Sequence, residues 1–246
     1  MRIRQKNREK CRRIVRQHYH QRGWISPYKK YQTVLEGLLD ESSSVLDVGC
    51  GREFPMAPRL LATGAEVHGI DPVGDTDLSI PGVTLRQGNA ERIPYDDQTF
   101  DVVTSCAVLE HLQNPVDVFE EFRRVLKPDG RVVFLTPGRY DYVSIIARLV
   151  PNRFHGKLVE ATEGRQEEDT FPTFYRANSV GQITTVSEKA GLAVERAEYV
   201  DEYPYALMFS PLLCWLGILY DKTIQKLKCL NWLQGWMLGV LRRGRP

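Results

Sequence analysis

Apolar residues in the middle of the chain occur in two alternating patterns. Short apolar runs recur at residues 44–49, 65–71, 83–90, 100–107, 131–137 and 192–200. Such runs indicate strands, and the first, 44–49, is expected to be buried in a parallel sheet. Between them lie stretches with helical spacing, and the stretch 115–126 places these apolar residues on one face: Val116, Phe119, Phe122, Val125 and Leu126. The alternation predicts an α/β fold.

Residues that start or stop helices support this reading. Gly64 follows a predicted helix over 54–63, and Gly191 follows one that begins at a cap on Asn178 or Ser179 and runs to Ala190. Strands joined in this way form a doubly wound, mostly parallel sheet with helices on both faces. Ligands bind to such a sheet at the carboxyl ends of its strands.

The two ends of the chain differ in composition from its middle. Residues 1–22 hold nine Lys/Arg and one acid, and the tail after Leu241 adds three arginines. The net charge of +2 therefore conceals a remainder with 21 basic and 30 acidic residues. Basic ends on an acidic body favour an anionic partner, either a membrane surface or nucleic acid, although solvated arms have the same composition.

A predicted division of the chain follows from these shifts. We expect a basic N-terminal arm and lid helix at 1–40 and a main domain at 41–200, with an acceptor-side insertion at 138–176. An apolar, aromatic, helical C-terminal extension follows at 201–246. The basic N-terminus does not lead into an apolar run, so no secretory signal is expected.

The C-terminal extension contains two uncharged runs, 203–220 and 229–241. The first is short for a transmembrane helix and is interrupted by Pro204 and Pro211. A helical hairpin fits better, and it could pack on the domain, mediate dimerisation or dip into one leaflet of a membrane. Peripheral membrane contact through 203–245 is therefore one expectation.

Cysteine and histidine usage limits the other chemistry. The five cysteines are an odd number without CxxC spacing, and the five histidines show no ligand spacing with cysteine or carboxylate pairs. We expect neither a disulfide framework nor a metal. A cytoplasmic protein, peripheral at the membrane surface if the extension binds there, fits this pattern. The overall content of 42% hydrophobic and 26% charged residues is that of a soluble globular protein.

The stretch VLDVGCGREF at 45–54 carries the main chemical signal. Gly49 and Gly51 after a buried strand let the backbone approach a ligand closely. The third glycine of a dinucleotide fingerprint is replaced by Phe54, and Asp47 would repel a pyrophosphate. The turn therefore favours a ligand with a cationic portion and no phosphate, a description that S-adenosylmethionine meets. Asp71, at the end of the next strand, can accept hydrogen bonds from both ribose hydroxyls.

At this point a family resemblance becomes visible. Five ordered blocks carry it: VLDVGCG (45–51), VHGIDP (67–72), GNAERIPYDDQTFDVV (88–103), VLEHLQNP (108–115) and RVLKPDGRVVFLTP (124–137). Over roughly 40–200 the chain resembles the class I S-adenosylmethionine-dependent methyltransferases, specifically the small-domain group of ubiquinone- and menaquinone-type enzymes. The resemblance implies a Rossmann-like, seven-stranded sheet with S-adenosyl-L-methionine as cofactor.

The resemblance also implies a cofactor site, which we carry over block by block to Asp47, Gly49, Gly51, Asp71, Asn89, Ala90 and Cys106. The two glycines and Asp47 would surround the methionine part, and Asp71 would hold the ribose. The pair 89–90 would meet the adenine, and Cys106 would lie beside the sulfonium. The family usually has aspartate where this chain has Asn89, whose amide can still accept and donate at the adenine edge.

The expected reaction is methyl transfer by in-line displacement to a small-molecule or lipid-like acceptor. His111 is the candidate general base, or it fixes its loop by a hydrogen bond. The residues at 104–107 lack the Asn/Asp-Pro-Pro-aromatic block of nucleic-acid amino-methylating enzymes, so a nucleic-acid substrate is not expected. The alternative is a non-catalytic cofactor-binding protein that recruits RNA or a protein partner through its basic arm.

Overall fold

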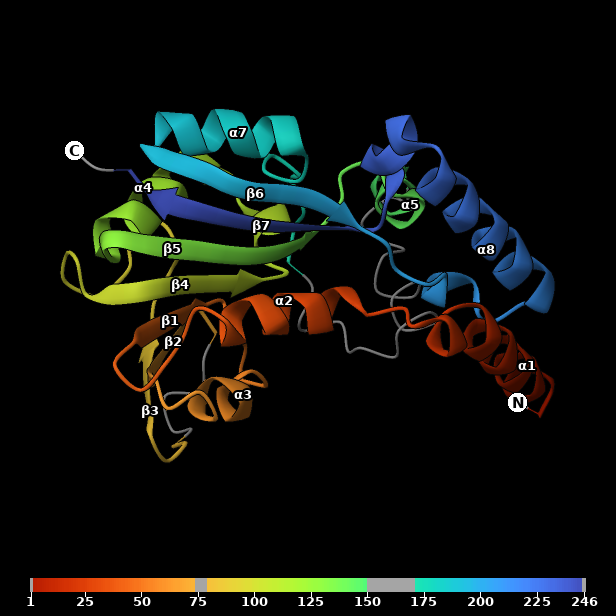
Figure 1. The fold of residues 1–246 in the computed structure, drawn as a ribbon, viewed down its shortest axis with the longest axis horizontal. Helices are drawn as coiled ribbons and strands as arrows, with labels where there is room; N and C mark the ends of the chain where they lie inside the picture. The colour runs from red at the N-terminus through yellow and green to blue at the C-terminus, as the bar shows by residue number, and fades with distance from the viewer. Residues whose placement is uncertain (1, 74–78, 150–170, 245–246) are drawn as a thin grey trace. The chain divides into compact units, whose positions relative to one another are not determined.

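The computed structural model describes residues 2–73, 79–149 and 171–244. Its chain forms two compact units (Figure 1). The sheet unit comprises Tyr28–Thr136, Thr173–Glu198 and Met237–Pro246. The helical unit comprises Met1–Pro27, Pro137–Pro172 and Tyr199–Trp236. Of the predicted acceptor-side insertion at 138–176, residues 150–170 lie outside the described residues.

A seven-stranded sheet is the centre of the fold. Its strands are β1 (Ser44–Val48), β2 (Glu66–Asp71), β3 (Val83–Gln87), β4 (Phe100–Cys106), β5 (Leu126–Pro137), β6 (Leu192–Val200) and β7 (Trp236–Arg243), in the spatial order β3-β2-β1-β4-β5-β7-β6. The pairs β1–β2, β1–β4, β2–β3 and β4–β5 are parallel. In Figure 1 the arrow of β7 points the opposite way to that of β4. The sheet is thus mostly parallel and doubly wound, which confirms the predicted fold class.

Helices cover both faces of this sheet. They are α2 (Pro27–Glu36), α3 (Ala57–Leu61), α4 (Pro115–Val125) and α7 (Val180–Lys189), with α2 and α3 on one face and α4 and α7 on the other (Figure 1). The predicted apolar face of α4 buries Phe119, Phe122 and Val125 completely. Ser179 caps α7 by accepting a hydrogen bond from the backbone N–H of Gln182. Apolar spacing therefore predicted α4, and the capping residue predicted the start of α7.

Helix α3 is shorter than the predicted 54–63. Phe54 adopts a left-handed backbone conformation, with φ of 44°, and Pro55 follows it. Neither position can belong to a regular helix interior, so the helix begins only at Ala57. The Phe54 ring is nevertheless almost fully buried and contributes to the core.

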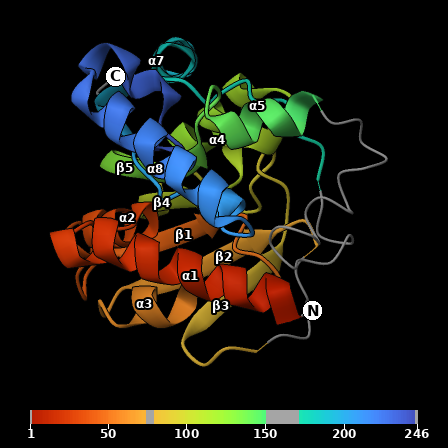
Figure 2. The same ribbon diagram turned by 90° about the vertical axis from the view of Figure 1, so that its right-hand side faces the viewer.

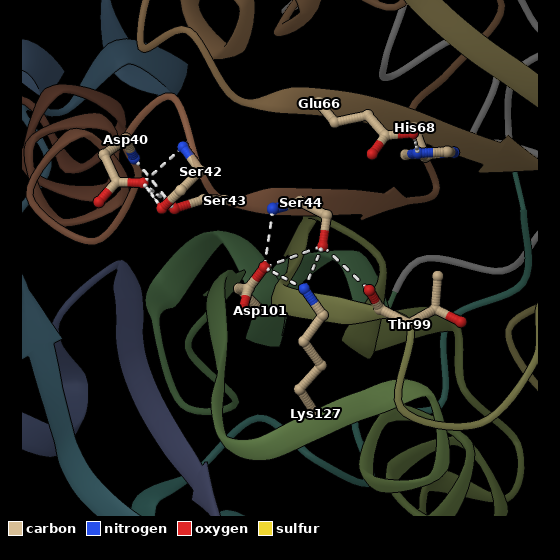
Figure 3. Close-up of polar contacts among 9 residues, drawn as sticks. All are labelled: Asp40, Ser42, Ser43, Ser44, Glu66, His68, Thr99, Asp101 and Lys127. Atoms are coloured by element: carbon tan, nitrogen blue, oxygen red, sulfur yellow. Dashed lines mark hydrogen bonds and ion pairs between the residues drawn. The ribbon is translucent and has the colours of Figure 1, made fainter.

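A polar network fixes the amino-terminal edge of the strands (Figure 3). The backbone N–H and the hydroxyl of Ser44 on β1 both donate to Oδ2 of Asp101 on β4 at 2.9 Å. The ammonium of Lys127 on β5 reaches the same oxygen at 2.7 Å. Although partial burial raises the pKa of Asp101, the hydrogen bonds from Lys127 and Ser44 leave it lowered. Three neighbouring strands are therefore tied together at the edge opposite the glycine turn.

The C-terminal extension departs from the expectation of a purely helical segment. Residues Trp236–Arg243 form strand β7, which inserts between β5 and β6, and every side chain from 236 to 241 is buried. A run that is apolar at every position has no period that separates strand from helix. The missing side chain of Gly239 also makes room for the ring of Phe134 on β5, because a Cβ there would lie 2.1 Å from that ring. The prediction of helix over this part of 201–246 was therefore wrong.

The helical unit contains two longer helices that lie side by side. Its elements are α1 (Arg2–His18), η1 (His20–Arg22), α5 (Tyr142–Leu149), η4 (Tyr205–Leu207), α8 (Pro211–Lys226) and η5 (Lys228–Leu233). Cys11 and Val15 of α1, with Tyr19 just past its end, share a core with Cys214 and Ile218 of α8. Figure 2 shows the two helices as neighbours. The hydroxyl of Tyr19 donates to Asp221 at 2.5 Å. Among the described helices, none combines the length and the apolar character needed to cross a bilayer.

We expect Gly239→Ala to lower the stability of the protein by about 1–3 kcal/mol, because the added methyl group overpacks β7 against Phe134. Gly181→Ala is the matched control, since a Cβ at Gly181 in α7 meets nothing within 4 Å and alanine favours a helix. Urea unfolding followed by circular dichroism measures both variants. Equal stability of the two variants would contradict the packing of β7 against β5.

Candidate functional site

The predicted site residues converge on the carboxyl ends of adjacent strands. Asp47 lies on β1, where its backbone is in register with Gly69 on β2 and Thr104 on β4. Asp71 and Cys106 are the last residues of β2 and β4. Parallel pairing therefore brings Asp47, Asp71 and Cys106, which are far apart in sequence, to one edge of the sheet.

The glycine turn after β1 is held against β2 by backbone hydrogen bonds. The N–H groups of Gly49 and Cys50 donate to the carbonyl of Ile70 at 2.8 and 3.1 Å. The N–H of Gly51 donates to Oδ2 of Asp71 at 2.9 Å. The turn and the acid predicted for the ribose are thus one connected structure.

The two glycines of the turn have different reasons to lack a side chain. Both adopt left-handed conformations, with φ of 77° at Gly49 and 73° at Gly51. A Cβ on Gly49 would lie 2.3 Å from Cγ2 of Val108, whereas a Cβ on Gly51 would meet nothing within 4 Å. Gly49 is therefore required by protein packing, and Gly51 leaves open space that a ligand can use.

The carboxyl group of Asp47 is the least satisfied polar group of the site. Asp47 is 3% exposed, and its Oδ1 has no hydrogen-bond partner. Burial, with the neighbouring charge of Asp71, raises the pKa of Asp47 to about 7. A buried carboxylate without a donor is costly, so this position is complementary to a cationic ligand that donates hydrogen bonds.

Besides Asp71, a phenol and two thiols lie near Asp47. The phenol of Tyr31 on α2 is fully buried and is hydrogen-bonded to the hydroxyl of Thr104. Burial, Asp47 and Cys106 all raise the pKa of Tyr31. Burial, Asp47 and Glu110 likewise raise the pKa of the Cys106 thiol, and burial with Asp47 and Asp71 raises that of Cys50 to about 12. Phenol and thiols therefore stay protonated at neutral pH.

Asn89 and Ala90 lie just past the end of β3, beside the strand that carries Asp71. The N–H of Gly88 donates to the carbonyl of Asp71 at 3.3 Å, and the N–H of Arg92 donates to that of Asn89 at 3.1 Å. Asn89 is exposed and Ala90 is partly exposed. The turn therefore holds an accessible amide one strand away from the predicted ribose position.

His111 lies in the short helix η2 (Leu109–His111), one residue beyond a buried anchor. Glu110 accepts a hydrogen bond from Thr136 at 3.1 Å, and Thr136 accepts one from Asn178 at 2.7 Å. The backbone carbonyl of Glu110 also accepts from the N–H of Tyr175 at 3.1 Å. The loop after β4 is therefore fixed to β5 and to the segment before α7 by Glu110.

The side chain of His111 itself is 29% exposed, and its Nε2 lies 3.9 Å from Oε1 of Glu110. That distance is longer than a hydrogen bond. The partly exposed imidazole stays a candidate general base. Its catalytic role stays a prediction.

Sequence reasoning missed Tyr31 and the network of Glu110, Thr136 and Asn178. A weak signal existed for Tyr31, because Tyr28, Tyr31 and Leu35 have helical spacing in the predicted lid. No comparable signal existed for the network, whose members lie 26 and 42 residues apart. In residues 2–73, 79–149 and 171–244, no three His, Cys, Asp or Glu side chains are arranged to hold a metal ion.

Comparison with known proteins places this geometry in a family. Residues 46–134 match the family described as "Methyltransferase domain". The chain is 31% identical over 171 residues to the demethylmenaquinone methyltransferase of Bacillus subtilis, which covers 62% of this chain and 70% of that protein. The chain belongs to the class I S-adenosylmethionine-dependent methyltransferases.

Other relatives agree with this family. The chain is 29% identical over 165 residues to a Mycolicibacterium smegmatis protein named "probable S-adenosylmethionine-dependent methyltransferase", with 61% of this chain and 63% of that protein covered. Geranyl diphosphate C-methyltransferase from Streptomyces coelicolor shares the fold, with a TM-score of 0.54, 17% identity and coverage of 87% of this chain and 76% of that one. The chain thus spans 63% of the M. smegmatis relative, 70% of the B. subtilis relative and about half of others.

The residues at the sheet edge fit S-adenosylmethionine, the cofactor of this family. The orphaned oxygen of buried Asp47 can accept from its ammonium group, and the open space at Gly51 permits close approach of the backbone. Oδ1 and Oδ2 of Asp71 each accept one backbone N–H, from Val73 and Gly51, and retain acceptor capacity for ribose hydroxyls. The fit therefore rests on the carboxylate of Asp47 and on the open space at Gly51.

We expect the affinity for S-adenosylhomocysteine, which keeps the ammonium group, to rise as the pH increases through about 7. Because the pKa of Asp47 is raised to about 7, a bound cation must displace its proton, and the affinity changes by up to about tenfold per pH unit below that value. The stability of the free protein should change with pH in the opposite direction to the affinity. The contribution of Asp47 to stability is largest below its ordinary pKa of 3.8 and is lost as the pH rises to about 7. Calorimetry in buffers of different ionisation enthalpy measures the released proton.

Asp47→Asn is the control for this measurement, since it retains the shape of the side chain and removes its titration. The variant should bind more weakly and release no proton near pH 7. An unsubstituted protein whose affinity is the same on both sides of pH 7 would contradict the assignment of Asp47 to the ammonium group.

Proposed function

We propose that the protein methylates a quinone-type, lipid-like small molecule with S-adenosylmethionine as the methyl donor. The observation that carries this proposal is the similarity to relatives named for such acceptors, namely demethylmenaquinone methyltransferase of B. subtilis and ubiquinone biosynthesis O-methyltransferase of Acinetobacter baumannii. The family match at 46–134 includes every residue that we assign to the cofactor. A ring acceptor with an apolar tail also suits a cytoplasmic enzyme that makes peripheral contact with the membrane.

The proposed roles follow the order of the strands. Asp47 holds the ammonium group, and Gly49 and Gly51 shape the space for the methionine portion. Asp71 accepts from the ribose hydroxyls, and Asn89 pairs with the adenine edge beside Ala90. Cys106 lies where β4 ends, beside the sulfonium.

The protein environment favours transfer to the acceptor rather than to the protein. When bound, S-adenosylmethionine supplies an activated methyl group, and we propose in-line displacement by the acceptor. The thiolate is the nucleophilic form of cysteine, so the raised pKa values of Cys50 and Cys106 keep these neighbouring thiols unreactive. Alignment and exclusion of water are then the main contributions of the site.

We expect the protein to transfer a labelled methyl group from S-adenosylmethionine to demethylmenaquinone that has been reduced to its hydroquinone with dithionite and presented in detergent micelles. The hydroquinone ring is the nucleophile, and it loses a proton as it gains the methyl group. The matched acceptor is a water-soluble hydroxylated naphthalene without the prenyl tail, for which a lipid-like specificity predicts a much lower kcat/KM. Solvent extraction followed by mass spectrometry measures the product. Binding of S-adenosylhomocysteine with transfer to neither acceptor would contradict the proposed substrate class while leaving the cofactor site intact.

We expect His111→Gln to lower kcat by about 10²–10⁴-fold on a hydroxyl acceptor, because general bases contribute that much to proton removal. Binding of S-adenosylhomocysteine should be unchanged, since His111 is not assigned to the cofactor. A variant that keeps its kcat would show that His111 is not the base.

A further inference from the structure

Helix α8 exposes an apolar stripe to solvent. Leu212, Trp215, Leu216 and Leu219 are 70%, 49%, 53% and 61% exposed. Their i, i+3, i+4, i+7 spacing places them on one face of the helix. The opposite face carries the buried residues of α8, which are Cys214, Gly217, Ile218, Asp221 and Ile224. Four large apolar side chains gathered on one exposed face mark an interaction surface.

Helix α1 borders this stripe along one edge. The side-chain amide of Asn7 donates to the carbonyl of Phe209 at 3.4 Å. Further along, the ring of His18 meets the edge of Trp215 at 4.8 Å, and Nδ1 of His18 lies 2.9 Å from Nζ of Lys222. Asn7, early in α1, thus contacts a residue just before the start of α8, and His18, at the end of α1, contacts residues within α8. Figure 2 shows the two helices as neighbours.

The side of α1 nearest the stripe is basic. Lys6, Lys10 and Arg13 are exposed and form one row along the helix. With 3.6 residues per turn, this row lies next to the edge that carries Asn7 and His18, which touch the α8 segment. Within residues 6–18, the other exposed cations are Arg8, Arg12 and Arg16, and they form a second row beyond the buried stripe of Cys11, Val15 and Tyr19.

We propose that this surface, the apolar stripe of α8 with the row Lys6–Lys10–Arg13, docks on an anionic lipid bilayer. The apolar side chains enter the boundary between headgroups and acyl chains, with Trp215 at the interface, and the cations contact lipid phosphates. This inference rests on the peripheral membrane contact of the proposed function. It assigns that contact to α8 and α1 instead of to residues 203–245 as a whole. Of the residues predicted to make that contact, 236–241 are buried in β7, and α1 takes their place.

Charge favours a bilayer over a second copy of this chain as the occupant. A two-fold dimer that pairs the α8 stripes of two copies in antiparallel orientation would also bring their basic rows together. Like charges in such an interface repel, whereas an anionic bilayer neutralises them. The stripe is therefore suited to a surface of opposite charge.

Vesicle flotation of the full chain tests the proposal. The vesicles contain phosphatidylcholine alone or mixed with phosphatidylglycerol. We expect binding to the mixed vesicles that weakens with added salt. The substitutions Lys6→Gln, Lys10→Gln and Arg13→Gln together should reduce it by about tenfold or more, as should Leu212→Gln, Leu216→Gln and Leu219→Gln together.

The matched control is Arg8→Gln, Arg12→Gln and Arg16→Gln, which removes the same charge from the same helix on its other side. This variant should lose clearly less binding. Equal losses from the two rows, or no flotation of the unsubstituted chain with anionic vesicles, would overturn the proposal. A dimer in analytical ultracentrifugation that the three leucine substitutions dissociate would also overturn it, because the stripe would then be occupied by a second copy.

Calorimetry with S-adenosylhomocysteine separates this proposal from that of the methyltransferase function. All three triple variants should bind it as the unsubstituted protein does, since none of the substituted residues belongs to the sheet unit. Flotation without methyl transfer refutes only the proposed acceptor, and methyl transfer without flotation refutes only the docking surface.

Discussion

The structure places one carboxylate, that of Asp47, where burial and a second acid both act against its charge. Desolvation and the neighbouring Asp71 disfavour ionisation, and Oδ1 receives no hydrogen bond. The fold can hold such a group because β1 is buried along its whole length between β2 and β4. A phosphate at this position would be repelled by the Asp47 carboxylate, whereas a cation would be attracted to it. The charge of this one carboxylate therefore distinguishes the cofactor of this family from a dinucleotide.

The reacting edge of the sheet is rigid because its loops are tied to elements distant in sequence. The turn after β1 is hydrogen-bonded to the end of β2 through Ile70 and Asp71. The loop after β4 is held through Glu110 by Thr136 and Asn178. Pre-positioned groups of this kind lower the entropic cost of aligning a methyl acceptor, which is the principal demand of the reaction.

The parts of the fold that the sequence predicts are those whose signals are local. The strands β1, β2 and β4 each contain a short apolar run between turn signals, and Ser179 marks the start of α7 by its capping chemistry. Strand β7 lacks such a signal, because an apolar run without polar positions is compatible with either helix or strand. The roles of Tyr31 and Glu110 depend on partners that only the folded chain brings near, so neither could be read from spacing. Asp47 and Asp71 were accessible to sequence reasoning because parallel strands place their carboxyl ends together.

The distribution of charge along the chain supports the proposed docking of the helical unit on an anionic bilayer. The net charge of +2 is the difference between basic ends and a remainder with an excess of acids. An anionic surface attracts residues 1–22, which hold nine Lys/Arg and one acid and belong to the helical unit. The exposed stripe of α8, in the same unit, can then add short-range binding. Charge provides the long-range attraction and apolar burial provides the persistence, whereas neither a basic helix nor an apolar helix alone would supply both.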